Sequence, residues 1–337
     1  MDRRTFLKSL GMLAAGSFMP SIEAKAENTE GCRLVVIGID SLRIDYARIL
    51  REIGLPALES LNRPVCATCG GLSRTQPGWA SIWTGLPSEL INCYDNTIFG
   101  GMPYRETPEG SVRCDYHIMS HLIEMYKDQD FYIGWVTGKG YNIKGDIPES
   151  PHWDVCDAIK NKKHSGRYYG DHGRSTENVY DLGSKVLAEA QQHDNFIVFI
   201  HFGEPDGTGH RAVNERWPYH WPAYMDVAVD VLGRVFDLMG GLDCDVDIIA
   251  CSDHGFGFKL ADDWNGYHHR PDARNHHQFE PFGFVSTNFP IKEYRHVSQM
   301  SIGRLIYDRA GGNPDLVKVP CQWTTYRMYG ERLALWH

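Results

Sequence analysis

Four largely apolar runs of strand length, at residues 33–39, 131–136, 196–202 and 246–251, constrain the fold of this chain more than any other feature. Continuous apolar runs are typical of strands that are buried on both faces, as in parallel sheets covered by helices. The 337 residues, 42% of them hydrophobic, are enough for one large domain or two small ones. We therefore predict an α/β fold with a parallel sheet.

Each run is followed by side chains that can carry chemistry. In α/β sheets, ligands bind outside the carboxyl ends of the strands, so these side chains are expected in a cleft. They are Asp40, Lys139, Asp206 with His210, and Asp253 with His254.

Ordinary structural explanations compete with this one. Asp40 is also placed to cap a helix predicted over residues 44–53, and Lys139 is equally a solvated charge. Asp253 is also placed to cap a turn, with His254 exposed to solvent beside it. As metal ligands, Asp253 and His254 would instead supply one oxygen and one nitrogen atom.

Asp206 and His210 are four residues apart in a segment that contains Gly207 and Gly209. Glycines let a loop fold tightly, so the pair is interpreted as a bidentate metal clip on a loop, with a solvated loop as the alternative. His276 and His277 precede a strand predicted over residues 282–286 and are further metal-ligand candidates.

Thr75 precedes Pro77 by two residues, and Gly85 and Pro87 end the segment that follows. This pattern predicts a helix that begins at or just after Thr75. The free N–H groups there favour an anion, and a hydroxyl beside them becomes a nucleophile if a metal removes its proton. An ordinary helix cap is the alternative.

Three further segments have a local interpretation. Ser175 is expected to cap a helix over residues 176–193. Residues 97–112 and 143–175 are interpreted as loops over the active face, and residues 321–337 as a hairpin over a sheet edge. Cys66 and Cys69 form either a small disulfide or two buried thiols, and with nine cysteines at least one is unpaired.

Residues 1–26 resemble a twin-arginine export signal. Arg3 and Arg4 precede a short apolar run at residues 10–19, and an Ala-x-Ala site ends at Ala26. The run is shorter than the roughly 18 residues that span a bilayer, so no membrane anchor is expected. The resemblance implies the export machinery as a partner and a periplasmic or secreted protein.

The net charge of the chain limits which classes of molecule it is expected to bind. Removing the signal, with four cationic and two anionic side chains, lowers the formal net charge from −9 to −11. An acidic surface disfavours nucleic-acid polymers and anionic membranes, which leaves small substrates. The sequence does not specify an oligomeric state.

The order and context of these motifs resemble the alkaline phosphatase superfamily, particularly its nucleotide pyrophosphatase/phosphodiesterase-like branch. The resemblance covers nearly the whole of residues 33–337. It implies a three-layer α/β/α sandwich with a mostly parallel central sheet and loop insertions over the active face. It also implies a hydrolase that cleaves a small phosphorylated substrate.

The resemblance assigns roles by motif. Thr75 is the nucleophile, which forms a covalent phosphothreonine, and a ligand of one of two divalent ions. Zinc fits the ligands best, with manganese or iron as alternatives. Asn96, with Asn92 as a competitor, contacts a phosphoryl oxygen, and Lys139 contacts the substrate anion. The first ion has Asp40, Asp253 and His254 as ligands, and the second has Asp206, His210 and either His276 or His277.

Other enzymatic activities are compatible with the same set of site residues. A related monoesterase branch has an arginine where this chain has Tyr141, so a phosphodiester is favoured over a monoester, and phosphonate hydrolysis stays open. A sulfatase is disfavoured, because the nucleophile segment around Thr75 has neither the modifiable residue nor the arginine of that branch. From another class, a non-catalytic exported metal-binding protein is the alternative.

Overall fold

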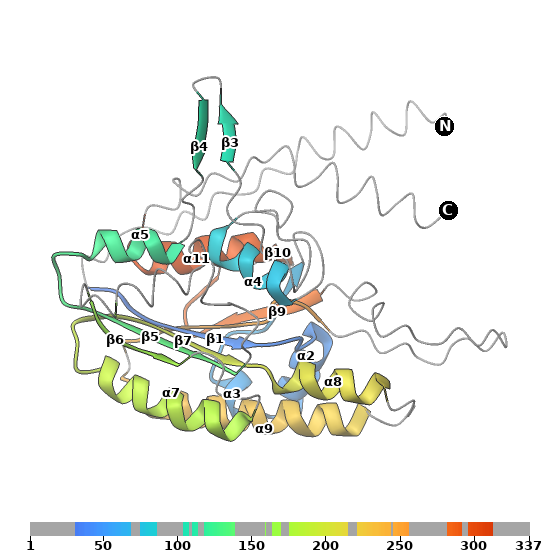
Figure 1. Cartoon of the computed structure of the whole chain (residues 1–337). Helices are drawn as coiled ribbons and strands as arrows, with labels where there is room; N and C mark the ends of the chain where they lie inside the picture. The colour runs from blue at the N-terminus through green and yellow to red at the C-terminus, as the bar shows by residue number, and fades with distance from the viewer. Residues whose placement is uncertain are drawn as a thin grey trace, which may run out of the picture. The chain divides into compact units, whose positions relative to one another are not determined.

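A sheet of eight strands forms the centre of this computed structural model (Figure 1). The strand order is β10-β2-β9-β8-β1-β7-β5-β6. β9 runs antiparallel to its two neighbours, whereas all other neighbouring strands are parallel, which confirms a mostly parallel sheet. The strands are β1 (Arg33–Ile39), β2 (Val65–Thr68), β5 (Phe131–Thr137), β6 (Ser165–Tyr169), β7 (Asn195–Phe202), β8 (Asp247–Cys251), β9 (Phe282–Thr287) and β10 (His296–Ser298).

The structure describes residues 31–68, 75–85, 104–107, 110–113, 118–138, 159, 164–169, 175–214, 221–243, 245–255, 282–291 and 296–312. All of them belong to one compact unit, Glu30–Val319. None of the helices within these ranges is long and apolar enough to cross a bilayer. The proposed signal at residues 1–26 and the hairpin at residues 321–337 lie outside the described residues.

Helices cover both faces of the sheet, so the prediction of three layers is confirmed (Figure 1). One face carries α4 (Thr75–Thr84), α5 (Ile118–Met125) and α11 (Gln299–Arg309). The other face carries α2 (Ile44–Glu52), α3 (Pro56–Glu59), α7 (Thr176–Ala190), α8 (Glu204–Asn214) and α9 (Trp221–Gly240).

The sequence of β1 explains its central place. Successive side chains of a strand point to opposite faces. Val35 and Ile37 pack into the core beneath α2 and α9, while Leu34 and Val36 pack into the core beneath α4 and α11. All four are fully buried, so the carboxyl end of β1 is held between two helical layers.

Two glycines let α4 approach the strands closely. A Cβ atom on Gly38 of β1 would lie 2.5 Å from the Trp79 ring, and one on Gly78 of α4 would lie 2.9 Å from the Cβ of Asp253. These separations are too short for any larger side chain. The glycines therefore bring the start of α4 to the carboxyl ends of β1 and β8.

Ser175 lies at the cap position of α7, as the sequence predicts, but it does not cap the helix through its side chain. Ser175 has the extended backbone of a cap residue, but its side chain makes no capping hydrogen bond. The Glu204 carboxylate takes that role from the start of α8, accepting hydrogen bonds from the Thr176 amide at 2.7 Å and the Thr176 hydroxyl at 2.6 Å. A carboxylate serves better there because it also complements the positive end of the helix dipole.

The two segments interpreted as loops contain strands. β6 lies within residues 143–175 and pairs with β5 as the edge strand of the sheet. One side of an edge strand faces solvent, so β6 lacks the apolar run that marks the central strands. In the other segment, β3 (Tyr104–Thr107) pairs with β4 (Gly110–Arg113), which ends one residue beyond residues 97–112, in a separate two-stranded sheet.

Of the two interpretations of Cys66, the structure supports the buried thiol. Cys32, Cys66 and Cys251 are free and buried, and Cys69 lies outside the described residues. Burial raises the pKa of the Cys66 thiol, and it raises the pKa of Cys32 to about 12. Both thiols therefore stay protonated at neutral pH and are poor nucleophiles.

Candidate active site

Three strands of the sheet end at the same edge and deliver acidic and imidazole side chains there. β1 pairs in parallel with β8 and β7, with Gly38 opposite both Cys251 and His201. Asp40 leaves the end of β1, and Asp253 and His254 leave the end of β8. All three are fully buried, and the expectation that they line a cleft stays a prediction.

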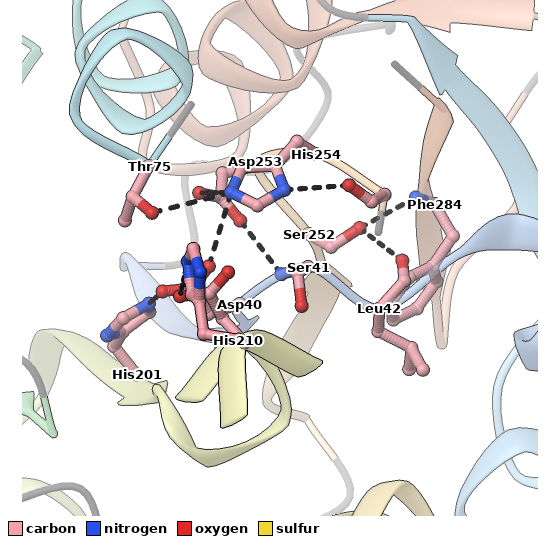
Figure 2. Close-up of polar contacts among 12 residues, drawn as sticks. Asp40, Ser41, Leu42, Thr75, His201, His210, Ser252, Asp253, His254 and Phe284 are labelled. Atoms are coloured by element: carbon pink, nitrogen blue, oxygen red, sulfur yellow. Dashed lines mark hydrogen bonds and ion pairs between the residues drawn. The ribbon is translucent and has the colours of Figure 1, made fainter. Parts of the chain in front are cut away.

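The three side chains converge on one point (Figure 2). The Nε2 atom of His254 lies 3.5 Å from Asp40 Oδ1 and 3.4 Å from Asp253 Oδ2. The three ligand atoms all lie within 4.8 Å of one another. Asp40 does not cap α2, since the cap position of that helix is Arg43 and it has no side-chain capping bond.

The orientation of His254 gives this cluster its chemical character. Its Nδ1 atom lies 2.9 Å from the carbonyl oxygen of Gly255. A carbonyl only accepts hydrogen bonds, so Nδ1 donates its proton there and the neutral ring keeps a lone pair on Nε2. That lone pair faces two carboxylate oxygens, an arrangement that a divalent cation stabilises.

Each carboxylate presents its two oxygens to different groups. Asp253 Oδ1 accepts a hydrogen bond from the Ser41 amide at 3.2 Å, while Oδ2 faces His254. Asp40 Oδ2 lies 3.7 Å from His201 Nε2, while Oδ1 faces His254. Two hard oxygens and one imidazole nitrogen fit zinc or another divalent transition metal.

Thr75 is the first residue of α4, as its sequence context predicts. Its side chain is buried, and its Oγ1 atom lies 3.4 Å from His254 Nε2 (Figure 2). The hydroxyl therefore points into the cluster. The first turn of α4 adds free peptide N–H groups beside it.

Asp206 and His210 lie side by side, but on a helix and not on a loop. They are four residues apart on α8, and His210 Nε2 is 3.3 Å from Asp206 Oδ2. Residues at this spacing share a helix face, and Pro205 is tolerated in the first turn. Asp206 is buried, whereas the His210 side chain is 35% exposed.

The sequence interpretation missed His201. This fully buried residue of β7 faces Asp40 Oδ2 through its Nε2 atom, and its ring packs edge-on against Trp79 with centroids 5.0 Å apart. One polar residue inside an otherwise apolar run was the available signal. A buried imidazole needs a polar partner, which marks His201 as a site residue.

Four of the predicted site residues lie outside the described residues: Asn96, Lys139, His276 and His277. The same holds for Asn92 and Tyr141.

The three-layer fold and the carboxylate–imidazole cluster at its strand ends agree with the family resemblance of the sequence motifs. Residues 34–298 match the sequence profile of the family described as Type I phosphodiesterase / nucleotide pyrophosphatase. The chain therefore belongs to this family and is a hydrolase that acts on phosphoester bonds. No curated protein sequence is a significant match.

Solved structures are similar to this chain at low sequence identity. The C-terminal periplasmic domain of EcEptC from Escherichia coli is 12% identical, with a TM-score of 0.50, over 86% of this chain and 85% of that one. Murine ectonucleotide pyrophosphatase / phosphodiesterase 5 is 12% identical, with a TM-score of 0.49, over 84% of this chain and 96% of that one. Lipoteichoic acid synthase LtaP from Listeria monocytogenes is 12% identical, with a TM-score of 0.49, over 84% of this chain and 73% of that one.

Proposed function

We propose that the protein is a two-metal phosphodiesterase in which Thr75 is the nucleophile and forms a covalent phosphothreonine. The observation that carries this proposal is the 3.4 Å separation between Thr75 Oγ1 and His254 Nε2. It puts a hydroxyl next to a buried cluster of ligand atoms at a helix start. Such an arrangement suits nucleophilic attack on phosphorus.

The chemistry of the donor set fits divalent cations. Asp40, Asp253 and His254 would hold one ion. Asp206 and His210 would hold the second, with either His276 or His277. When bound, the ions lower the pKa of a coordinated hydroxyl and stabilise the charge that develops on the phosphoryl oxygens. Zinc suits these oxygen and nitrogen ligands best, with manganese or iron as alternatives.

Thr75 performs the displacement in two steps. Its hydroxyl loses a proton to solvent, Oγ1 attacks phosphorus, and the bond from phosphorus to the leaving ester oxygen breaks as that oxygen takes up a proton from water. Water then cleaves the bond between Oγ1 and phosphorus, which releases the phosphorylated product and restores the hydroxyl. The first-turn N–H groups of α4 are placed to donate hydrogen bonds to the phosphoryl oxygens, in the manner of a helix N-terminus that binds an anion.

The substrate is proposed to be a small phosphorylated molecule, with Asn96 and Lys139 contacting its anionic part. A phosphodiester is favoured because Tyr141 stands where a monoesterase branch has an arginine. Monoester and phosphonate hydrolysis are the alternatives on the same site. A metal-binding protein without catalysis is the alternative from another class, and the inward-facing Thr75 hydroxyl argues against it.

We also propose export by the twin-arginine route, with residues 1–26 as the signal and a periplasmic or secreted product. The arginine pair, the short apolar run and the Ala-x-Ala site support this. Fusing residues 1–32 to a reporter that is active only when exported folded tests it. Replacement of Arg3 and Arg4 by lysine is expected to abolish export, and unchanged export would contradict it.

One substrate panel tests the hydrolase proposal. Purified protein, analysed for bound metal, is assayed with aryl phosphodiester, aryl phosphomonoester, aryl phosphonate ester and aryl sulfate. The highest kcat/KM is expected for the diester, and a chelator is expected to abolish the activity. Equal or higher turnover of the sulfate would contradict the proposal, as would bound metal with no turnover of any phosphorus ester.

A further inference from the structure

The turn that follows β1 has a strained backbone beside the site. Ser41 has φ = 64°, and it is the one non-glycine residue with positive φ in the described part of the chain. This left-handed conformation is unfavourable for a residue that carries a side chain. Ser41 is fully buried and lies directly between Asp40 and α2, so the surrounding contacts must maintain the strain.

The Leu42 amide donates to the Ile39 carbonyl within the turn at 3.3 Å, and side chains from distant segments add further hydrogen bonds. The Ser41 amide donates to Asp253 Oδ1 at 3.2 Å, which joins the end of β1 to the end of β8. The hydroxyl of Tyr224, from α9, donates to the carbonyl of Ser41 at 2.8 Å. The Ser252 hydroxyl donates to the carbonyl of Leu42 at 2.7 Å and accepts from the amide of Phe284 at 2.9 Å (Figure 2).

We propose that Tyr224 and Ser252 are positioning residues for the metal ligand Asp253, an inference that rests on the proposed function. They hold the peptide groups on either side of Leu42, which keeps Ser41 in its left-handed conformation. In that conformation the Ser41 amide engages Oδ1 of Asp253 and leaves Oδ2 directed at His254. Hydrogen bonds that orient ligand carboxylates affect metal affinity without contacting the ion.

Tyr224 reaches the site from a different layer of the fold. It is fully buried on α9, and its ring packs against Tyr46 of α2 with centroids 5.6 Å apart. Burial raises its pKa well above the usual range, so the hydroxyl keeps its proton and remains a donor to Ser41. A purely structural role would make Tyr224 important for folding but not for cation affinity.

The test compares two hydroxyl deletions that are chemically alike. Tyr224→Phe removes the bond to the Ser41 carbonyl, whereas Tyr126→Phe removes a 2.9 Å bond from Tyr126 to the Ala310 carbonyl on the opposite face of the sheet. Each variant keeps its buried ring. Binding of Zn²⁺ alone to metal-stripped protein is measured by calorimetry, with urea unfolding to record stability.

Tyr224→Phe is expected to weaken Zn²⁺ binding by about tenfold, while Tyr126→Phe binds as the wild type does. Ser252→Ala is expected to match Tyr224→Phe, with Ser184→Ala as its control, because Ser184 donates to the Tyr180 carbonyl within α7 at 2.9 Å. If the wild type binds Zn²⁺ and both Tyr224→Phe and Ser252→Ala bind it with the same affinity, the positioning inference is overturned while the proposed function stands. Failure of the wild type to bind Zn²⁺, Mn²⁺ or Fe²⁺ would overturn it together with the metal-dependent function.

Discussion

Thr75 and His254 are separated by 179 positions in the chain, yet Oγ1 of Thr75 lies 3.4 Å from Nε2 of His254. The start of α4 supplies one partner and the end of β8 the other. Because Gly38 and Gly78 permit close packing of α4, the contact follows from the packing of a helix on a sheet. The proposed nucleophile and a proposed metal ligand are therefore in direct contact.

The glycine in β1 is expected to be essential for that geometry. Gly38→Ala places a Cβ atom 2.5 Å from the Trp79 ring, which forces α4 and Thr75 away from the strands. We expect a loss of about 1–3 kcal/mol in the free energy of unfolding, together with a lower kcat. Urea unfolding and steady-state kinetics measure the two effects.

Gly233→Ala is the matched control for this substitution. Gly233 lies within α9, and its added Cβ atom would meet nothing within 4 Å. Alanine favours a helix interior over glycine by about 1 kcal/mol, so this variant is expected to be more stable. Equal stability of the two variants would refute the close-packing account.

His201 is expected to influence the site through Asp40. His201→Phe keeps a buried ring against Trp79 but removes the nitrogen 3.7 Å from Asp40 Oδ2. We expect Zn²⁺ affinity to fall about tenfold, because Asp40 Oδ2 loses the imidazole that favours its present orientation. Calorimetry with metal-stripped protein measures the affinity.

His193→Phe provides the comparison for His201. His193 pairs with Asp130 at 2.8 Å, at the opposite ends of β7 and β5 from the site. Its removal is expected to leave Zn²⁺ affinity at the wild-type value. If both variants bind as the wild type does, His201 has no part in orienting Asp40.

Glu189 is expected to contribute to the loss of folding stability at acidic pH. Hydrogen bonding from Arg167 at 2.9 Å, and further from Tyr132 at 3.0 Å, lowers the pKa of the Glu189 carboxyl in the folded protein. A carboxyl group with a lowered pKa in the folded protein stabilises the fold at pH values above its usual pKa of about 4.3. That stabilisation is lost as the pH falls through the folded-state pKa. Glu189 is partly exposed, so the effect is modest.

Glu189→Gln tests this linkage. The variant is expected to be less stable than the wild type at about pH 6 and closer to it at about pH 3, because its amide does not titrate. Urea midpoints at the two pH values give the comparison. A constant difference between the two proteins would show that Glu189 does not contribute to the acid response.

Much of the site was predictable because strand ends are visible in the sequence. The apolar runs before Asp40 and Asp253 end where the strands end, and parallel pairing brings those ends together. The helix that carries Asp206 and His210 was not predictable from local composition, since two glycines lie between them. Packing of α8 on α9 overrides that weak helix propensity.

Features that depend on tertiary contacts could not be predicted from the local sequence either. Serine gives no sign of a left-handed backbone, which at Ser41 is imposed by Asp253, Tyr224 and Ser252. Glu204 caps α7 from another helix, 28 positions away. Such contacts appear only when distant segments are assembled.

The most direct test of the account is the hydrolysis rate of Thr75→Ala, compared with Thr84→Ala. Thr84 is equally buried at the other end of α4, where its hydroxyl donates to the Ala80 carbonyl at 2.7 Å. We expect Thr75→Ala to retain its fold and bound metal while kcat/KM for the best phosphodiester falls by a factor on the order of 10³ or more. Thr84→Ala is expected to stay near the wild-type rate. Turnover by Thr75→Ala equal to that of Thr84→Ala would contradict the assignment of Thr75 as the nucleophile.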